Sequence, residues 1–173
     1  DLSVDNFLIP YLGSYNNPCI RRVIQIENCP FQEFRVPKVI VIMDDDFHYH
    51  FCYLSLILDA YSEEIIGWSV GPTLETTYPI EALRMALQRI RGNDVHLIHH
   101  SDRGCQYASR EYVNILKANG IQISMTESGD PKDNAQAERI NNTMKNELLK
   151  GRIFRSINEV IAAVAVAVDF YNN

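Results

Sequence analysis

Hydrophobic and polar positions along the chain change their period several times, and each change marks a predicted element. Short apolar or β-branched runs between polar turns are typical of strands, whereas apolar residues repeated every three or four positions are typical of helices. The pattern predicts three successive strands with short polar links, at residues 39–43, 50–62 and 64–70. Short links between successive strands favour an antiparallel arrangement.

After Gly71 the period becomes helical, because Ile80, Leu83, Leu87 and Ile90 fall on one helix face. Strands and helices then alternate. Capping residues mark several helix ends, and the last, largely apolar helix is predicted to be buried. The further predicted elements are strands at 95–100 and 121–125, and helices at 109–120 (cap Ser109, C-terminal Gly120), 133–151 (cap Asp133) and 156–173 (cap Ser156 with Glu159).

This order of elements predicts an α/β fold. Three antiparallel strands followed by strand–helix–strand links indicate a mixed five-stranded sheet with helices on both faces. Ribonuclease-H-like topology is one fold with this order. Residues 1–38 have no clean period and contain four prolines, so they are predicted to be irregular apart from one short strand at RRVIQI, residues 21–26.

Composition sets limits on the class of protein. The chain has 173 residues, 46% of them hydrophobic and 22% charged, which are ordinary values for one folded domain. It has no apolar run of about 20 residues and no basic N-terminal signal region, so a cytoplasmic protein without a membrane span is expected. The four cysteines show no zinc-finger spacing, and reduced thiols are expected.

Charge narrows the kinds of nucleic-acid contact that are feasible. The formal net charge of −6 argues against binding DNA by bulk electrostatic attraction. It leaves open an acidic site that meets DNA through two divalent ions.

Two carboxylates are placed for such a site. Asp102 follows the predicted strand 95–100, at the strand end where ligands usually bind. Glu138 lies on the helix after the next strand, with 35 residues between the two acids, and a strand–helix–strand unit of that length returns to the same sheet edge. Together they could hold Mg²⁺ or Mn²⁺ for attack on a phosphate. Alone, Asp102 would more simply be a turn-forming residue.

Polar residues near these acids are candidates for DNA contact. Asn142 and Lys145 share a helix face with Glu138 at the spacing of an α-helix, although a solvated surface would show the same charges. Arg103 and Asn134 complete the predicted DNA-contacting set. His99 and His100 point to opposite faces of a strand, and packed core histidines are the simpler interpretation.

Three blocks closely resemble one family. They are YLSLILDAYSEEIIGWSV, LIHHSDRGCQYAS and GIQISMTESGDPKDNAQAERINNTMKNE, and they are similar to the integrase-like catalytic core of bacterial insertion-sequence DDE transposases. The resemblance covers residues 39–173 as one catalytic core domain, and residues 1–38 do not resemble the upstream helix-turn-helix of the family.

The resemblance implies a ribonuclease-H-like fold and DNA strand cleavage and transfer with Mg²⁺ or Mn²⁺, in DNA transposition or integration. Asp102 and Glu138 match the second and third metal-binding acids of the family, and Lys145 matches a lysine placed near the DNA. The family also implies a homo-oligomer bound to the ends of the element and to target DNA.

The first acid of the family, an aspartate in the first strand, has no counterpart here. A hairpin that turns near residues 46–48 places Val36 or Arg35 opposite Leu58 and Asp59. Asp44 stands about 26 Å further along that strand, beyond the reach of a metal ligand, and would serve as the third catalytic acid only after a register shift.

Three other functions stay open at this stage. A catalytically inactive relic or nucleic-acid-binding module would keep the fold without the chemistry. A ribonuclease-H-like nuclease would use the same acids on another substrate. A protein-interaction domain fits the composition but leaves the specific blocks unexplained.

Overall fold

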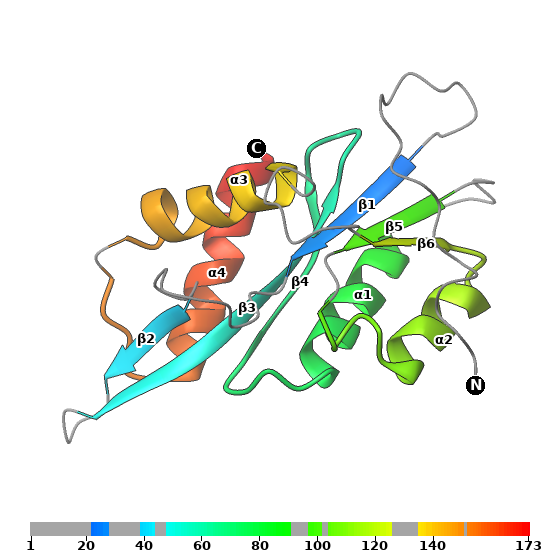
Figure 1. Cartoon of the computed structure of the whole chain (residues 1–173). Helices are drawn as coiled ribbons and strands as arrows, with labels where there is room; N and C mark the ends of the chain where they lie inside the picture. The colour runs from blue at the N-terminus through cyan, green and yellow to red at the C-terminus, as the bar shows by residue number, and fades with distance from the viewer. Residues whose placement is uncertain are drawn as a thin grey trace.

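The computed structural model has a mixed sheet with helices on both faces (Figure 1). The strands are β1 (Arg22–Glu27), β2 (Val39–Met43), β3 (Tyr49–Asp59), β4 (Ile65–Gly71), β5 (Leu97–Ser101) and β6 (Gln122–Met125). The helices are α1 (Thr77–Arg89), α2 (Arg110–Ala118), α3 (Ala135–Thr143), the π-helical η3 (Met144–Leu148) and α4 (Ile157–Asn172). The residues that the structure describes are 22–27, 39–43, 48–90, 97–101, 104–125, 135–150 and 152–173.

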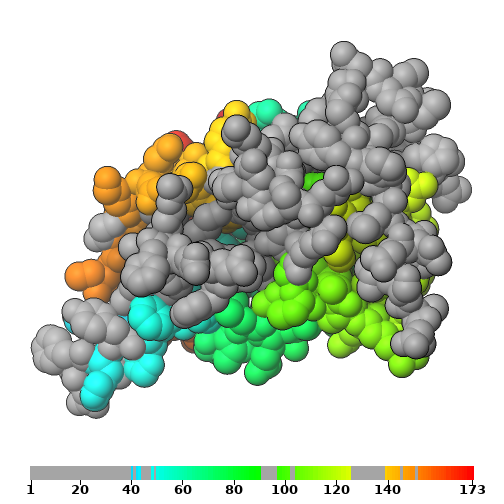
Figure 2. Space-filling model, viewed as in Figure 1, coloured from blue at the N-terminus to red at the C-terminus, as the bar shows by residue number. Residues whose placement is uncertain are grey.

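The long strand β3 organises the antiparallel part of the sheet. One of its edges pairs with β4 over Tyr53–Leu58. The other edge has two successive partners, β2 along Tyr49–Tyr53 and β1 along Leu56–Asp59. The β2–β3 hairpin, cyan in Figures 1 and 2, forms one end of the molecule. Beyond β1 the sheet continues with β5 and β6 in parallel, so β1 joins the antiparallel and parallel parts.

Of the two predictions that concern β1, its existence is confirmed and the strand predicted to pair with Leu58 and Asp59 is wrong. The short strand predicted at RRVIQI exists, and with it the sheet has six strands instead of the predicted five. The predicted pairing of Val36 or Arg35 with Leu58 and Asp59 is wrong, because Gln25 and Ile24 occupy those positions. The prediction continued the hairpin register backward through Pro37, which has no N–H to donate to a sheet.

Two hydrophobic cores lie on the two faces of the sheet. Helices α1 and α2 cover one face, where Ile57 and Ile66 of the sheet meet Leu83 of α1 and Leu116 of α2. Segments α3, η3 and α4 cover the other face. Their buried residues pack against the strand residues of that face: Cys52, Leu56, Leu58, Ile65 and Val70 meet Ile140, Met144, Val160, Val164 and Val168. The predicted helices on both faces are confirmed.

Helix ends follow the predicted capping residues where these are described. The Ser109 hydroxyl accepts from the N–H of Tyr112 at 3.3 Å, and the Ser156 hydroxyl accepts from the N–H of Glu159 at 3.3 Å. Gly120 ends α2 with a φ of +69°, a conformation that costs little only for glycine.

Two predictions for the last helices need correction. The helix predicted to run to Gly151 is α-helical only to Thr143 and then becomes the π segment η3. Helix α4 is not fully buried, because Val166 and Phe170 are 64% and 72% exposed. Its Ala- and Val-rich sequence is apolar all round, so periodicity could not show which side faces the sheet.

A close approach of backbones at Gly67 gives a test of the packing of α1 on β4. A Cβ at this position would lie 2.2 Å from the Ala82 carbonyl oxygen, an atom of the α1 backbone that cannot rotate away. We expect Gly67→Ala to lower the free energy of unfolding by about 3 kcal/mol. Gly120→Ala, which meets no atom but strains a positive φ, should cost only about 1 kcal/mol. Urea unfolding of both variants checks this, and equal losses would contradict the packing argument.

Candidate metal and nucleic-acid site

The parallel strands β1, β5 and β6 end at one edge of the sheet, which is where the predicted site begins. Ile26 of β1 is level with Ser101, the last residue of β5, and Ser101 is level with Met125 of β6. Asp102 directly follows Ser101 in the sequence. Ligands of open α/β sheets usually bind outside the carboxyl ends of such strands.

A compact turn, Gly104–Ala108, follows residues 102 and 103 in the sequence and is hydrogen-bonded to the rest of the fold. The carbonyl oxygen of Gly104 accepts from the N–H groups of Tyr107 and Ala108, at 3.0 and 3.2 Å. The buried side-chain amide of Gln106 donates to the Leu74 carbonyl at 3.3 Å, which connects the turn to the segment before α1. The chain is therefore held on both sides of residues 102 and 103, by β5 before them and by this turn after them.

Beneath this turn lies a buried aromatic cluster of His99, Tyr107 and Tyr112. The His99 Nε2 and the Tyr112 hydroxyl are 3.0 Å apart, and the His99–Tyr112 and Tyr107–Tyr112 ring centroids are each separated by 5.4 Å. All three side chains are at most 1% exposed. Edge-on aromatic contacts of this kind add rigidity and some stability. The cluster joins β5, the turn and α2 into one unit.

Burial determines the charge of this cluster. Desolvation lowers the pKa of His99 from 6.5 to about 3, so its imidazole is neutral near pH 7. Burial likewise raises the pKa of Tyr112. His99 is thus a packed, hydrogen-bonded core histidine, as the sequence analysis predicted.

His100 lies on the opposite face of β5. Its Nδ1 is 3.0 Å from the Ser124 hydroxyl of β6, and both side chains are buried. This face is also the one covered by α3, the helix whose sequence contains Glu138.

Helix α3 lies beside β1 on that face. Ile140 and Asn141 are buried against the sheet, whereas Asn142 is exposed, which leaves it accessible to a ligand. Arg139 forms an exposed ion pair with Glu63 of the β3–β4 turn, at 3.2 Å. An exposed pair contributes little stability, but it restrains the helix relative to the sheet.

The predicted site residues are only partly within the described structure. Asp44, Asp102, Arg103 and Asn134 lie outside the described residues, as do the side chains of Glu138 and Lys145. Among the described residues no group of three His, Cys, Asp or Glu side chains could hold a metal. The roles of these residues in the site therefore stay predictions.

Two observations on the backbone bear on Asp44 and Lys145. Met43, which precedes Asp44, pairs with Tyr49, about 23 Å along β3 from Leu56, where β1 ends. Lys145 belongs to η3, and a π segment turns less per residue than an α-helix. Lys145 is the second residue of this segment, so a shared face with Glu138 stays a prediction.

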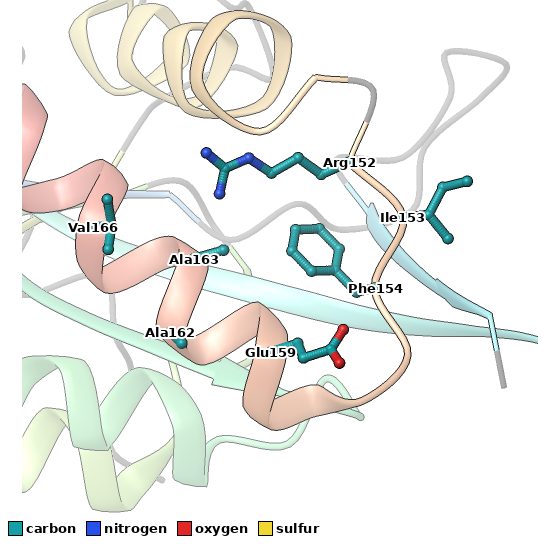
Figure 3. A pocket seen from close by; sticks show the side chains of 7 residues that line it. All are labelled: Arg152, Ile153, Phe154, Glu159, Ala162, Ala163 and Val166. Atoms are coloured by element: carbon teal, nitrogen blue, oxygen red, sulfur yellow. The ribbon is translucent and has the colours of Figure 1, made fainter.

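A separate groove lies between α4 and the segment before it (Figure 3). Its volume is about 510 Å³, and its lining is mostly apolar, with Phe154 and Val166 beside the charged Arg152 and Glu159. A single carboxylate is a poor ligand set for a divalent ion. This groove is therefore not the candidate metal site.

Sequence reasoning missed several residues that shape the site region. Asp59 is buried, and its Oδ1 accepts from the N–H of Tyr61 at 3.1 Å, so it forms the β3–β4 turn. An aspartate two residues before a turn N–H is a recognisable signal for this role. The contacts of Gln106 and Arg139 depend on distant segments and carry no local signal.

The cysteines and helices of the described part add two facts. Cys52 is a buried free thiol whose pKa is raised to about 11 by burial, and Cys105 is an exposed free thiol. None of the helices in the described ranges has the length and apolar character that a membrane crossing requires.

Comparison with known proteins identifies similar sequences. Two models described as Integrase core domain match the chain, over residues 31–131 and 119–173. The transposase for insertion sequence element IS629 of Shigella sonnei is 38% identical over 123 residues. That match covers 71% of this chain and 41% of the relative, so the chain spans less than half of that protein's length.

Solved structures show the same fold at low sequence identity. The catalytic domain of Mos1 mariner transposase has a TM-score of 0.64 at 16% identity, covering 87% of this chain and 73% of that one. The HTLV-2 integrase catalytic core domain in complex with magnesium, in its trimeric form, has a TM-score of 0.51 at 17% identity, covering 89% and 81%. The predicted ribonuclease-H-like fold class is confirmed.

The buried neutral His99 predicts a specific pH dependence of stability. The unfolded chain binds a proton near pH 6.5 that the folded cluster excludes down to about pH 3. Stability from this group is therefore present above pH 6.5 and is lost as the pH falls, by up to about 1.4 kcal/mol per pH unit. Urea unfolding at pH 7 and pH 5 should show a loss of about 2 kcal/mol that His99→Gln removes. Equal pH slopes in the two proteins would contradict this assignment.

Proposed function

The chain belongs to the integrase core domain family, and we propose that it is the catalytic core of an insertion-sequence transposase. It would cleave and transfer DNA strands with Mg²⁺ or Mn²⁺. The observation that supports this most directly is the sequence position of Asp102, next after the buried end of β5, together with Glu138 in the sequence of α3, which lies beside β1.

The donor chemistry fits a hard divalent ion. Asp102 and Glu138 supply carboxylate oxygens, the ligands that Mg²⁺ and Mn²⁺ prefer. The two residues of this chain would hold the ion between the end of β5 and α3. When bound, such ions polarise a phosphate and lower the pKa of an attacking water or hydroxyl. The magnesium complex of the HTLV-2 integrase core, which shares the fold, is consistent with this choice.

The described residues on either side of Asp102 in the sequence add no positive charge that would compete with a metal. His99 is neutral and is hydrogen-bonded to Tyr112, so it would not compete for the carboxylates. The end of β5 precedes residues 102 and 103, and the hydrogen-bonded turn Gly104–Ala108 follows them. Ordered flanking elements suit a metal site, because a restrained ligand binds with less loss of conformational freedom.

DNA would reach the metal along α3 and η3. Asn142 is exposed on α3, and Lys145, Arg103 and Asn134 are the other proposed contacts. Because the net charge is −6, Lys145, Arg103 and the bound metal would supply most of the attraction for phosphate. The HTLV-2 integrase catalytic core domain, which shares the fold, has a trimeric form, and we propose that this chain acts on DNA as a homo-oligomer.

One observation favours a second function, a nucleic-acid-binding module without catalysis. Strand β2, with the sequence VIVIM, contains no acid to match the first-strand aspartate of the family. With only two carboxylates, a clamp of two metal ions would be incomplete.

Neutralising the two acids separates these functions. We expect Asp102→Asn and Glu138→Gln each to reduce Mn²⁺-dependent strand transfer on DNA ends at least 100-fold, because a metal ligand is lost. Glu75→Gln removes the same charge at an exposed position before α1 and should leave the rate unchanged. Wild-type protein that binds DNA but shows no transfer would support the non-catalytic module, and faster cleavage of RNA–DNA hybrids than of DNA ends would support a nuclease.

The proposed DNA path has its own test at Lys145. We expect Lys145→Ala to weaken DNA binding about tenfold at low salt and to reduce the slope of log K against log salt by about one. The matched control is Lys117→Ala on α2, which lies on the other face of the sheet. Fluorescence anisotropy at several salt concentrations measures both, and an equal loss in the two variants would place the DNA elsewhere.

A further inference from the structure

Strand β1, which adjoins β5, ends in an acid that lies outside the two family matches. The family match begins at residue 31, whereas β1 spans Arg22–Glu27 and so precedes it. Within the sheet, β1 nevertheless occupies the central position, between β3 and β5. Its last residue is Glu27.

Glu27 and Asp102 are the residues that follow the last pair of the β1–β5 ladder in the sequence. Ile26 pairs with Ser101 in the parallel ladder of β1 and β5, and Glu27 and Asp102 are the next residues in their strands' directions. Neighbouring strands are about 4.8 Å apart. Residues at paired positions on two neighbouring strands are close enough for both to bind one divalent ion.

The register also places Glu27 on the face of α3. Its partner on β3 is Leu56, which is buried in the core that contains Ile140 and Met144. Two residues earlier, Gln25 is level with His100, and His100 lies on the face opposite to the His99 cluster. Helix α3, which carries Glu138 in its sequence, lies beside β1.

No other acid of the described strands stands at this end of the sheet. The six strands contain two acidic residues, Glu27 and Asp59. Asp59 pairs with Ile24, about 10 Å back along β1, and its carboxylate accepts from the Tyr61 N–H in the β3–β4 turn. Glu27 is thus the described acid at the carboxyl ends of the parallel strands.

We propose that Glu27 is the third carboxylate of the metal site, in the place of the first-strand aspartate that the family resemblance implies. The proposal rests on the proposed function, because it assumes a metal held by Asp102 and Glu138. It accounts for the absence of an acid from VIVIM: the strand beside β5 is β1, and β1 brings its own carboxylate.

Metal binding tests this without any measurement of catalysis. Mn²⁺ binding to the full chain is measured by titration calorimetry and by the paramagnetic resonance signal of free Mn²⁺. We expect Glu27→Gln to weaken Mn²⁺ binding at least tenfold, Glu27→Asp to retain binding within about threefold, and Glu75→Gln to match wild type. Circular dichroism and urea unfolding check that each variant is folded.

The outcomes separate this proposal from the proposed function. If Asp102→Asn and Glu138→Gln lose Mn²⁺ but Glu27→Gln binds it like wild type, the role of Glu27 is overturned and the two-acid site stands. If wild-type protein binds no Mn²⁺, both ideas are overturned.

A second measurement needs no variant and therefore no assumption about folding. Fe²⁺ with ascorbate and peroxide, loaded in place of Mn²⁺, generates radicals that cut the backbone close to the metal, and mass spectrometry maps the cuts. We expect cuts near residues 27, 102 and 138, all suppressed by excess Mg²⁺. Cuts near 102 and 138 without one near 27 would overturn the proposal.

Discussion

The pairing of β1 with β3 on one side and β5 on the other is the interaction on which the rest of this fold depends. Without it, the second half of β3 and the first parallel strand β5 would each present unpaired N–H and C=O groups in the middle of the sheet. The antiparallel part and the parallel part of the sheet are hydrogen-bonded to each other through β1. Helix α3 also lies beside this strand, so the proposed metal site shares its support with the sheet itself.

One face of the sheet contributes mainly to stability, and the other carries the proposed metal site. The α2 face has a buried, uncharged cluster beside the turn Gly104–Ala108, formed by His99, Tyr107 and Tyr112. On the α3 face, His100 and Ser124 form a buried polar pair. Rigid packing on one face and buried polar groups on the other suit a sheet that supports a binding site at the ends of its strands.

Local patterns predicted the elements whose partners are close in sequence. The hairpin of β2 and β3, the strand β4, the helices α1 and α2, and the caps Ser109 and Ser156 all follow from period and turn chemistry. The central position of β1 could not be predicted in this way, because its two partners lie far along the chain and six residues carry little register information. The π segment η3 and the exposed side of α4 likewise depend on tertiary packing.

The proposed metal site illustrates why position matters more than the number of acids. Asp44, Asp45 and Asp46 form the densest acidic run of the chain, yet the strand before them pairs with Tyr49, at the far end of β3 from β1. A divalent ion requires carboxylates that lie close together. Neighbouring parallel strands bring the residues at their carboxyl ends close together even when these are far apart in the sequence. Acids that are far apart in the sequence, at residues 27, 102 and 138, are therefore the ones that we propose to form one site. For an acidic domain, the DNA contact that we propose would depend on the positive charge of the ions that its carboxylates bind.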